Sequence, residues 1–336
     1  MMKKILMIGT GGTIASDMTP SGLTPDLDPG RLLQFIPNIK NHCEVDCIQC
    51  YNLDSTNIRP DHWLGLCRTV RDHYNDYDGF VISHGTDTMA YTAAALSYLI
   101  QNSEKPIVIT GAQKPIWFES TDSKRNLTDA FLYACHGSGG VVIVFDGKVI
   151  LGTRARKTYS KSFQAFSSVN YPILAVIQDE KLLQYIRTDE KSTSPTFCDT
   201  LNARVGLLKL FPGMHSDIVD YMLASHDGLI IESFGVGGLP EYSDFYDSVR
   251  RGAEAGKIIV MTTQVPNEGS DLSVYVVGGH LKSTVNLLEA HDMTTEAALT
   301  KLMWIMGQAR DFDTVKAMFY APVAKDILYS ESYKND

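Results

Sequence analysis

The four residues Thr-Gly-Gly-Thr at positions 10–13 follow directly on the apolar run Ile5-Leu6-Met7-Ile8. A short apolar run that ends in glycine is typical of a central parallel strand, buried on both faces. The glycines at 11 and 12 allow the backbone to turn sharply and a ligand to approach it closely. Because open α/β sheets bind ligands at the carboxyl ends of their strands, we expect an α/β fold with Thr13 at such an edge.

Two other interpretations of this motif exist. Gly9-Thr-Gly11 begins like the dinucleotide-binding pattern G-x-G-x-x-G, but its third glycine position falls on Ile14, and no clean strand-plus-acidic pattern follows about 20 residues later. The glycines also fit a plain turn from a strand into a loop. The motif alone does not distinguish a structural turn from a ligand-binding site, so the choice depends on other motifs in the chain.

Apolar runs alternate with helix-like segments along the chain, which is typical of parallel sheets covered by helices. The strands expected in the first part are 4–9, 45–51, 79–83, 106–110 and 141–145, and the helices are 61–73, 87–101 and 123–136, each with an Asp or Ser near its start for capping. In the second part we expect strands at 205–210, 228–231 and 257–261, and helices at 216–224, 243–255, 294–306 and 313–318.

This pattern predicts two domains. A larger N-terminal domain, residues 1–187, carries a mostly parallel, flavodoxin-like sheet, and a smaller parallel α/β domain spans residues 203–336. The polar stretch 188–202 lacks apolar spacing and is interpreted as the linker. The segment 15–30 also lacks periodicity, and we expect either a lid over a bound substrate or a plain surface loop.

Composition narrows the class of ligand. The chain has 336 residues, a net charge of -9 and no concentrated basic stretch, which argues against a nucleic-acid partner. No apolar stretch approaches the roughly 18 residues of a membrane span, and the N-terminal apolar run ends at Gly9, too early for a signal peptide. We therefore expect a cytoplasmic protein with a small-molecule substrate and no membrane partner.

The six cysteines are scattered along the chain and are expected to be free thiols. Cys43, Cys47 and Cys50 lie close together beside His42, which raises the question of a zinc site. Their spacing matches no standard pair of ligand pairs, and an alternating strand over 45–51 explains it as well. We expect no metal.

A second threonine motif follows the strand 79–83. His84-Gly85-Thr86-Asp87-Thr88 stands at a strand end and opens a helix, as Thr13 stands at the end of the first strand. Asp87 could serve simply as the N-cap of that helix. His84 is interpreted as a packed, hydrogen-bonded side chain.

A set of motifs covers nearly the whole chain. They are TGGTIA at 10–15, LDST at 53–56, DGFVISHGTDTMAYTA at 78–93, ITGAQKP at 109–115, the stretch 152–157 with Lys157, GVGGLP at 235–240 and MTTEAALTKLMWIMG at 293–307. With these motifs the chain resembles the bacterial-type L-asparaginase family, closest to its cytosolic type I branch. The pairing of TGGTI with HGTDTM at this separation is highly specific to that family.

The resemblance implies hydrolysis of a side-chain amide through an acyl-enzyme, with ammonia leaving before water releases aspartate. By similarity Thr13 attacks, while Thr86, Asp87 and Lys157 form a hydrogen-bonded set that moves protons. Threonine is a weak nucleophile at neutral pH and needs a base. A lysine accepts a proton only as a neutral amine, which burial and the neighbouring Arg154 and Arg156 favour and Asp87 opposes.

The resemblance also implies how the substrate is held. Ser55 and Thr56 receive the α-carboxylate, Asp87 also binds the α-amino group, and the Ala112 carbonyl faces the leaving amide. The backbone N–H groups of Thr13 and Thr86 are the expected oxyanion donors. The family implies no metal or organic cofactor, and a homodimer or homotetramer.

One position departs from the family. Many members carry a tyrosine in the lid, where this chain has Leu23. Another tyrosine could replace it, or Lys157 could serve the whole cycle. Leu23 also leaves open the hypothesis that this chain is a binding or sensing protein that does not turn over its ligand.

Two other kinds of enzyme share these motifs. They are the glutaminase-asparaginases and the amidotransferase component that releases ammonia for glutamyl-tRNA. That component usually has an N-terminal extension, whereas this chain starts at its first strand.

Overall fold

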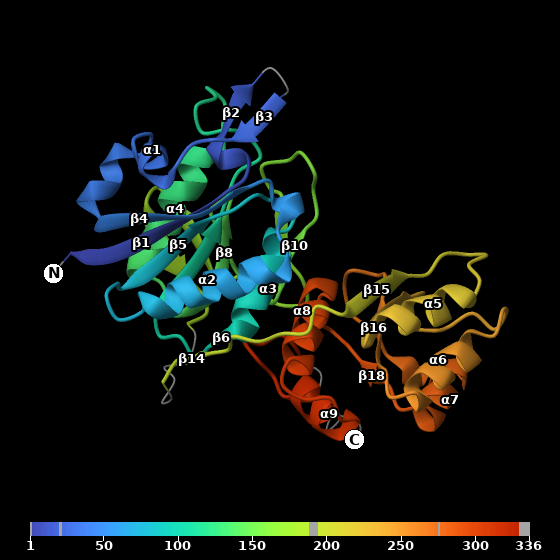
Figure 1. Cartoon of the computed structure of the whole chain (residues 1–336). Coiled ribbons are helices and arrows are strands. Elements are labelled where there is room, and N and C mark those ends of the chain that lie inside the picture. Colours follow the sequence, from blue (N-terminus) through green and yellow to red (C-terminus); the bar gives the residue numbers. More distant parts are fainter. Residues whose placement is uncertain (1, 20–21, 188–193, 275, 329–336) are drawn as a thin grey trace. The chain divides into compact units, whose positions relative to one another are not determined.

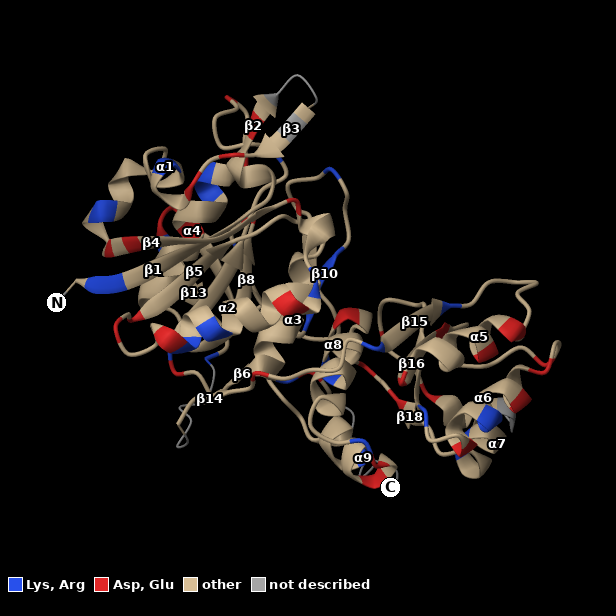
Figure 2. Cartoon of the chain, in the orientation of Figure 1, with Lys and Arg blue, Asp and Glu red and all other residues tan. Residues whose placement is uncertain are grey.

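The structure, a computed structural model, describes residues 2–19, 22–187, 194–274 and 276–328 (Figure 1). The chain divides into two compact units, residues 1–199 and 200–336. Lys and Arg are interspersed with Asp and Glu along both units (Figure 2). Among the described residues, no helix is long and apolar enough to cross a bilayer.

The first unit is built on one large sheet. Its strands are β1 (Lys3–Gly11), β4 (Cys43–Leu53), β5 (Gly79–Ser83), β7 (Pro106–Thr110), β8 (Gly140–Phe145), β9 (Lys148–Leu151), β12 (Ala175–Gln178) and β13 (Lys181–Gln184). The order is β13-β12-β9-β8-β7-β5-β1-β4, with β8, β7, β5, β1 and β4 parallel and the other pairs antiparallel. The predicted strands and the mostly parallel sheet are confirmed, and apolar runs such as Ile5 to Ile8 are fully buried.

Helices cover both faces of this sheet (Figure 1). They are α1 (Pro29–Leu33), α2 (Pro60–Asp72), α3 (Met89–Leu99) and α4 (Ser123–His136). The apolar face of α4 packs on Ile5, Met7 and Val81, while α2 and α3 lie over the other face. The remaining short elements of this unit are β6 (Ile100–Gln101), β10 (Ala155–Lys157), β11 (Phe166–Ser168), β14 (Thr196–Phe197) and the 3-10 turns η1 (Thr13–Ala15), η2 (Pro37–Asn41) and η3 (Ser55–Asn57).

The capping prediction was wrong for all three predicted helices of this unit. Helix α2 begins at Pro60, whose fixed φ suits a first turn, and Asp61 instead pairs with Arg59. Helix α3 begins at Met89 after Thr88, two residues beyond Asp87, and the side chain at its N-cap makes no capping bond. Helix α4 has no capping bond from Asp122, because that carboxylate accepts from the backbone of Gln113 instead.

The segment 15–30 is more regular than the sequence suggests. It forms an antiparallel hairpin of β2 (Ser16–Thr19) and β3 (Gly22–Pro25), followed by the start of α1 at Pro29. Asp17, Met18 and Thr24 are exposed, so this two-stranded ribbon needs no apolar alternation. The expectation of a segment without regular structure was therefore wrong, whereas the lid remains a hypothesis. The Leu23 side chain lies outside what the structure describes.

The predicted linker, 188–202, falls only partly on described residues, since 188–193 lie outside them. Within the rest of it, β14 pairs antiparallel with β6, so Thr196 and Phe197 belong to the first unit's fold.

The second unit contains a four-stranded parallel sheet in the order β15 (Val205–Lys209), β16 (Gly228–Ser233), β17 (Ile258–Thr263) and β18 (Leu288–Glu289). Its helices are α5 (Asp217–Ser225), α6 (Phe245–Glu254), α7 (Val276–Thr284), α8 (Thr295–Met306) and α9 (Phe312–Tyr320), with the 3-10 turn η4 (Leu272–Val274). The predicted elements are confirmed within a few residues, and α7 and β18 are additional. A fully buried ion pair, Lys301 Nζ to Asp326 Oδ2 at 2.7 Å, joins α8 to the segment after α9.

Candidate active site

All the predicted site residues except Lys157, which ends β10 in a separate two-stranded sheet, follow the carboxyl ends of four neighbouring strands. In the sheet order β7-β5-β1-β4, these ends lead into Ala112, Thr86, Thr13 and Ser55, respectively. Strands β1 and β5 are in register up to the pair Gly9 and Ser83. The two threonine motifs therefore leave the sheet side by side.

Glycines let these motifs pack directly on each other. A Cβ atom on Gly12 would lie 2.3 Å from the backbone nitrogen of Gly85, and Gly12 also has a φ of +78°. A Cβ atom on Gly85 would lie 2.6 Å from Ser55 Oγ. Glycine is thus required for close approach, which brings Ser55 and the backbones before Thr13 and Thr86 to one place.

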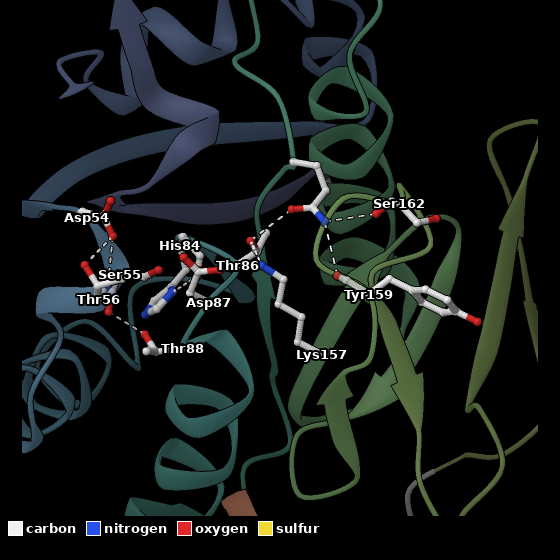
Figure 3. A network of polar contacts seen from close by, with 12 residues as sticks. Asp54, Ser55, Thr56, His84, Thr86, Asp87, Thr88, Lys157, Tyr159 and Ser162 are labelled. Atoms are coloured by element: carbon white, nitrogen blue, oxygen red, sulfur yellow. Dashed lines mark hydrogen bonds and ion pairs between the residues drawn. The ribbon is translucent and has the colours of Figure 1, made fainter. Parts of the chain in front are cut away.

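Lys157 links two of the predicted site residues in Figure 3. It ends β10, and its Nζ donates to Thr86 Oγ1 at 2.7 Å and to Asp87 Oδ1 at 2.6 Å (Figure 3). The Lys157 side chain is 17% exposed, whereas that of Asp87 is 58% exposed. Asp87 is thus an ion-pair partner rather than an N-cap, and its exposed edge remains accessible to a ligand.

Thr13 begins the short turn η1 directly after Gly12. Its side chain is partly exposed, and its hydroxyl makes no hydrogen bond to any described residue. The structure therefore leaves Thr13 outside the hydrogen-bonded set of Thr86, Asp87 and Lys157, although the backbones of the two motifs touch.

The other predicted substrate contacts differ in accessibility. Ser55 is buried, and its carbonyl accepts from Thr88 Oγ1 at 2.8 Å. Thr56 is exposed, and both its backbone N–H and its hydroxyl donate to Asp54 Oδ1 at 2.9 Å. Ala112 is fully buried as a whole residue, backbone included.

Gln113 is a site residue that the sequence reasoning missed. Its Oε1 accepts from Thr86 Oγ1 at 3.3 Å, and its Nε2 donates to the carbonyl of Ser162 at 3.1 Å. Its backbone N–H is held by Asp122 Oδ2 at 2.9 Å. The position of Gln113 after a third strand end was the available signal, but the contact with Thr86 depends on the fold.

His84 is packed and hydrogen-bonded, as predicted, and it lies within a buried relay. Trp63 Nε1 donates to Thr92 Oγ1 at 3.0 Å, Thr92 Oγ1 lies 2.9 Å from His84 Nε2, and His84 Nδ1 lies 2.7 Å from the Gly85 carbonyl. A carbonyl only accepts, so Nδ1 carries the proton and the Thr92 hydroxyl donates to Nε2. Burial lowers the pKa of His84 to about 4, which keeps this ring neutral.

The cysteine cluster does not form a metal site. All six cysteines are free thiols, as predicted. Cys43, Cys47 and Cys50 lie along β4, and in a strand a spacing of three residues places Cys47 and Cys50 on opposite faces. Across the described ranges, no group of three or more His, Cys, Asp or Glu could hold a metal ion.

Family comparisons agree with the geometry of both units. The model described as "Asparaginase, N-terminal" matches residues 4–190, and "Glutaminase/Asparaginase C-terminal domain" matches residues 204–319. The chain belongs to the asparaginase family. The sequence resemblance is thereby confirmed, and so is the two-part α/β fold.

The relatives of this chain are named for two different activities. It is 36% identical over 328 residues to an L-asparaginase of Thermococcus kodakarensis, covering 97% of this chain and 100% of the relative. It is 32% identical over 337 residues to one component of the glutamyl-tRNA(Gln) amidotransferase of Pyrococcus furiosus, covering 96% of this chain and 76% of that protein.

Solved structures agree at the level of the whole chain. The thermostable L-asparaginase from Thermococcus kodakarensis superposes with a TM-score of 0.93 at 36% identity, covering 97% of this chain and 100% of that one. L-asparaginase I from Vibrio cholerae superposes with a TM-score of 0.87 at 28% identity, covering 98% and 100%.

Proposed function

We propose that this chain is an L-asparaginase, which hydrolyses L-asparagine to L-aspartate and ammonia. The observation that carries the proposal is the contact of Lys157 with both Thr86 and Asp87, beside the Gly12–Gly85 junction from which Thr13 emerges. A lysine, a carboxylate and two hydroxyl groups at one sheet edge suit acyl transfer through an activated nucleophile.

In the proposed cycle the Thr13 hydroxyl attacks the side-chain amide carbonyl, ammonia leaves, and water then hydrolyses the threonine ester. The backbone N–H groups of Thr13 and Thr86 stabilise the oxyanion. When Lys157 is a neutral amine, it accepts a proton through Thr86, and the Asp87 carboxylate stabilises the resulting ammonium. In the structure the Thr86 hydroxyl donates to Gln113 Oε1 and accepts from Lys157, so this hydroxyl turns toward the neutral Lys157 amine when it passes a proton to it.

The substrate's charged ends need complementary partners. Asp87 is more than half exposed and carries the charge to bind an α-ammonium while it stays paired with Lys157. Ser55 and Thr56 supply hydroxyl and backbone donors for the α-carboxylate, and the carbonyl of Ala112 receives the amide N–H. No metal or organic cofactor takes part in this scheme.

Assembly and location are further parts of the proposal. By similarity to the family, we propose a homodimer or homotetramer in the cytoplasm. Light scattering coupled to size exclusion measures the oligomer directly, and a monomeric, fully active protein would contradict the proposed assembly.

The test is ammonia release from L-asparagine and, in parallel, from L-glutamine at neutral pH. Thr13→Ala is expected to abolish hydrolysis and leave asparagine binding, measured calorimetrically, largely intact. Thr69→Val removes a threonine hydroxyl in α2 that contacts Cys50 and the Gly65 carbonyl and none of the proposed site residues, and it is expected to retain activity. Normal turnover by Thr13→Ala would reject the nucleophile assignment.

Two outcomes point to other functions. Comparable rates of ammonia release from L-asparagine and L-glutamine would identify a glutaminase-asparaginase. The L-glutamine measurement is needed because one relative is a component of a glutamyl-tRNA(Gln) amidotransferase. One methylene separates the substrates, which a pocket distinguishes by only about 1–3 kcal/mol. A folded protein that binds asparagine without releasing ammonia would instead be a sensing protein.

A further inference from the structure

A buried chain of hydrogen bonds ends on the backbone directly before Thr86. It runs from Trp63 in α2 through Thr92 in α3 to His84, which follows β5, and ends at the Gly85 carbonyl. His84 and Thr92 are fully buried, and Trp63 is 6% exposed. The proposed catalytic cycle uses none of these three side chains.

The direction of these bonds is the same when it is worked out from either end. An indole nitrogen only donates and a carbonyl oxygen only accepts. The proton of the Thr92 hydroxyl therefore goes to His84 Nε2, and the proton of the neutral ring is on Nδ1, 2.7 Å from the Gly85 oxygen. The backbone N–H of His84 donates to the Thr110 carbonyl at 2.8 Å, so both the ring and the main chain of this residue are fixed.

The bond from Nδ1 sets the orientation of the peptide group between Gly85 and Thr86. In a trans peptide the C=O and N–H bonds lie in one plane and point in opposite directions. Because the Gly85 carbonyl points to the His84 ring, the Thr86 N–H points away from that ring.

The Thr86 N–H donates to none of the residues that the structure describes, although Thr86 is only 5% exposed. Buried backbone N–H groups are nearly always paired, so an unpaired one indicates a place for a ligand atom. The hydroxyl of the same residue contacts Lys157 Nζ at 2.7 Å and Gln113 Oε1 at 3.3 Å. The unpaired donor therefore belongs to a residue of the candidate active site (Figure 3).

We propose that His84 is a positioning residue, whose Nδ1–H holds the Gly85–Thr86 peptide so that the Thr86 N–H is presented to the oxyanion. The effect on turnover rests on the proposed function. Without this bond the peptide rotates more freely, and only a fraction of the molecules presents the donor. Because the oxyanion forms only in the transition state, the loss lowers kcat and leaves KM unchanged.

The experiment compares His84→Leu, which has no donor, with His84→Asn, whose amide nitrogen is bonded to Cγ as Nδ1 is. His84→Leu is expected to lower kcat for L-asparagine about fivefold, as the loss of one hydrogen bond predicts, with KM within about twofold. His84→Asn is expected to keep kcat within about twofold of wild type.

Tyr74→Phe is the control for a merely structural loss. It removes a buried hydrogen bond to Ser103 Oγ at 3.0 Å, in the segments that precede β5 and β7. This variant is expected to have a lower melting temperature and an unchanged kcat.

A second measurement does not depend on turnover. The nitrogen-15 NMR shifts of the His84 ring in wild type identify the nitrogen that carries the proton, which is expected to be Nδ1. The shift of the Thr86 amide nitrogen reports on the preceding carbonyl and is expected to move further in His84→Leu than in His84→Asn.

The two measurements separate the two proposals. If wild type releases no ammonia, the proposed function fails and the NMR shifts alone test the role of His84. A proton on Nε2 in wild type would overturn this role, and so would equal kcat values for His84→Leu and His84→Asn. If His84→Leu fails to fold, His84→Gln takes its place, because its amide nitrogen lies one bond further from Cβ, as Nε2 does.

Discussion

Gly12 and Gly85 are in backbone contact, so close that a single added Cβ atom on Gly12 would fall 2.3 Å from Gly85 N. This contact joins the ends of β1 and β5, where Thr13 and Thr86 begin. This close packing of the two glycines, rather than a hydrogen bond of the Thr13 hydroxyl, determines how the two motifs meet.

Gly85→Ala is expected to reduce kcat/KM at least about 100-fold, because its Cβ would lie 2.6 Å from Ser55 Oγ and push Thr86 away from Thr13. Crowding of this kind also costs about 1–3 kcal/mol of stability. Steady-state kinetics and urea unfolding measure the two effects. Gly279→Ala is the matched control, since nothing lies within 4 Å of its added Cβ in α7. Equal effects of the two changes on activity would contradict the close-packing requirement.

Lys157→Met is expected to lower kcat/KM by about 10²- to 10⁴-fold, the usual contribution of a proton-transferring group. Its free energy of unfolding should change by no more than about 1 kcal/mol, because ion pairs with exposed partners contribute little, and Asp87 is more than half exposed.

Lys3→Met is the matched control for Lys157→Met. It removes an ion pair, from Lys3 Nζ to Asp78 Oδ1 at 3.3 Å, at the N-terminal end of β1, opposite the end that leads to Thr13. Kinetics and unfolding of both variants distinguish a catalytic lysine from a structural one. An active Lys157→Met enzyme would exclude Lys157 from proton transfer.

Much of the fold was predictable because buried parallel strands are continuous apolar runs. The strands 79–83 and 106–110 have the predicted bounds, and every residue in them is buried. Helix α7 was missed because its sequence VVGGHLKST combines β-branched residues with two glycines, which disfavour a helix locally. The hairpin 16–25 was missed because its register is not set by burial of one face.

The site was predictable to the extent that its residues follow strand ends. The sequence motifs selected Thr13, Thr86 and Lys157 as candidates, and the roles that the family resemblance implies for them stay a proposal. The sequence could not show that Gln113 contacts Thr86, or that Trp63 and Thr92 orient His84, because these contacts depend on how the strands and helices pack in the fold. The interpretation of Asp87 as an N-cap, which the sequence left open, does not hold, because its carboxylate pairs with Lys157, 70 residues away.

The buried ring of His84 makes stability depend on pH. Its pKa of about 4 in the folded protein lies below the usual 6.5 of an unfolded histidine, so the unfolded chain binds the extra proton between these values. Stability from this group is complete above pH 6.5 and is lost as pH falls toward 4, by up to about 3 kcal/mol. His84→Asn, whose amide can still donate to the Gly85 carbonyl, should flatten that slope in urea unfolding. His136→Asn changes a histidine at the exposed end of α4 and should leave the pH dependence of stability unchanged.

Asp129 titrates with the opposite sign. Its carboxylate is buried, Arg125 Nε lies 3.6 Å away, and Oδ2 accepts no hydrogen bond within the described residues. Burial raises the pKa of Asp129 to about 7, above its unfolded value near 4. The folded protein therefore binds the extra proton in this window, and stability is lost as pH rises from 4 to 7.

Asp129→Asn should consequently be more stable than wild type at pH 8, by up to about 4 kcal/mol less its lost attraction to Arg125, and about equal to it at pH 4. Because the windows of His84 and Asp129 overlap with opposite signs, the wild-type curve partly hides both. Difference curves between each variant and wild type, taken by urea unfolding from pH 4 to 8, separate them. A pH-independent difference for Asp129→Asn would show that this carboxylate is already ionised throughout the range in the folded protein.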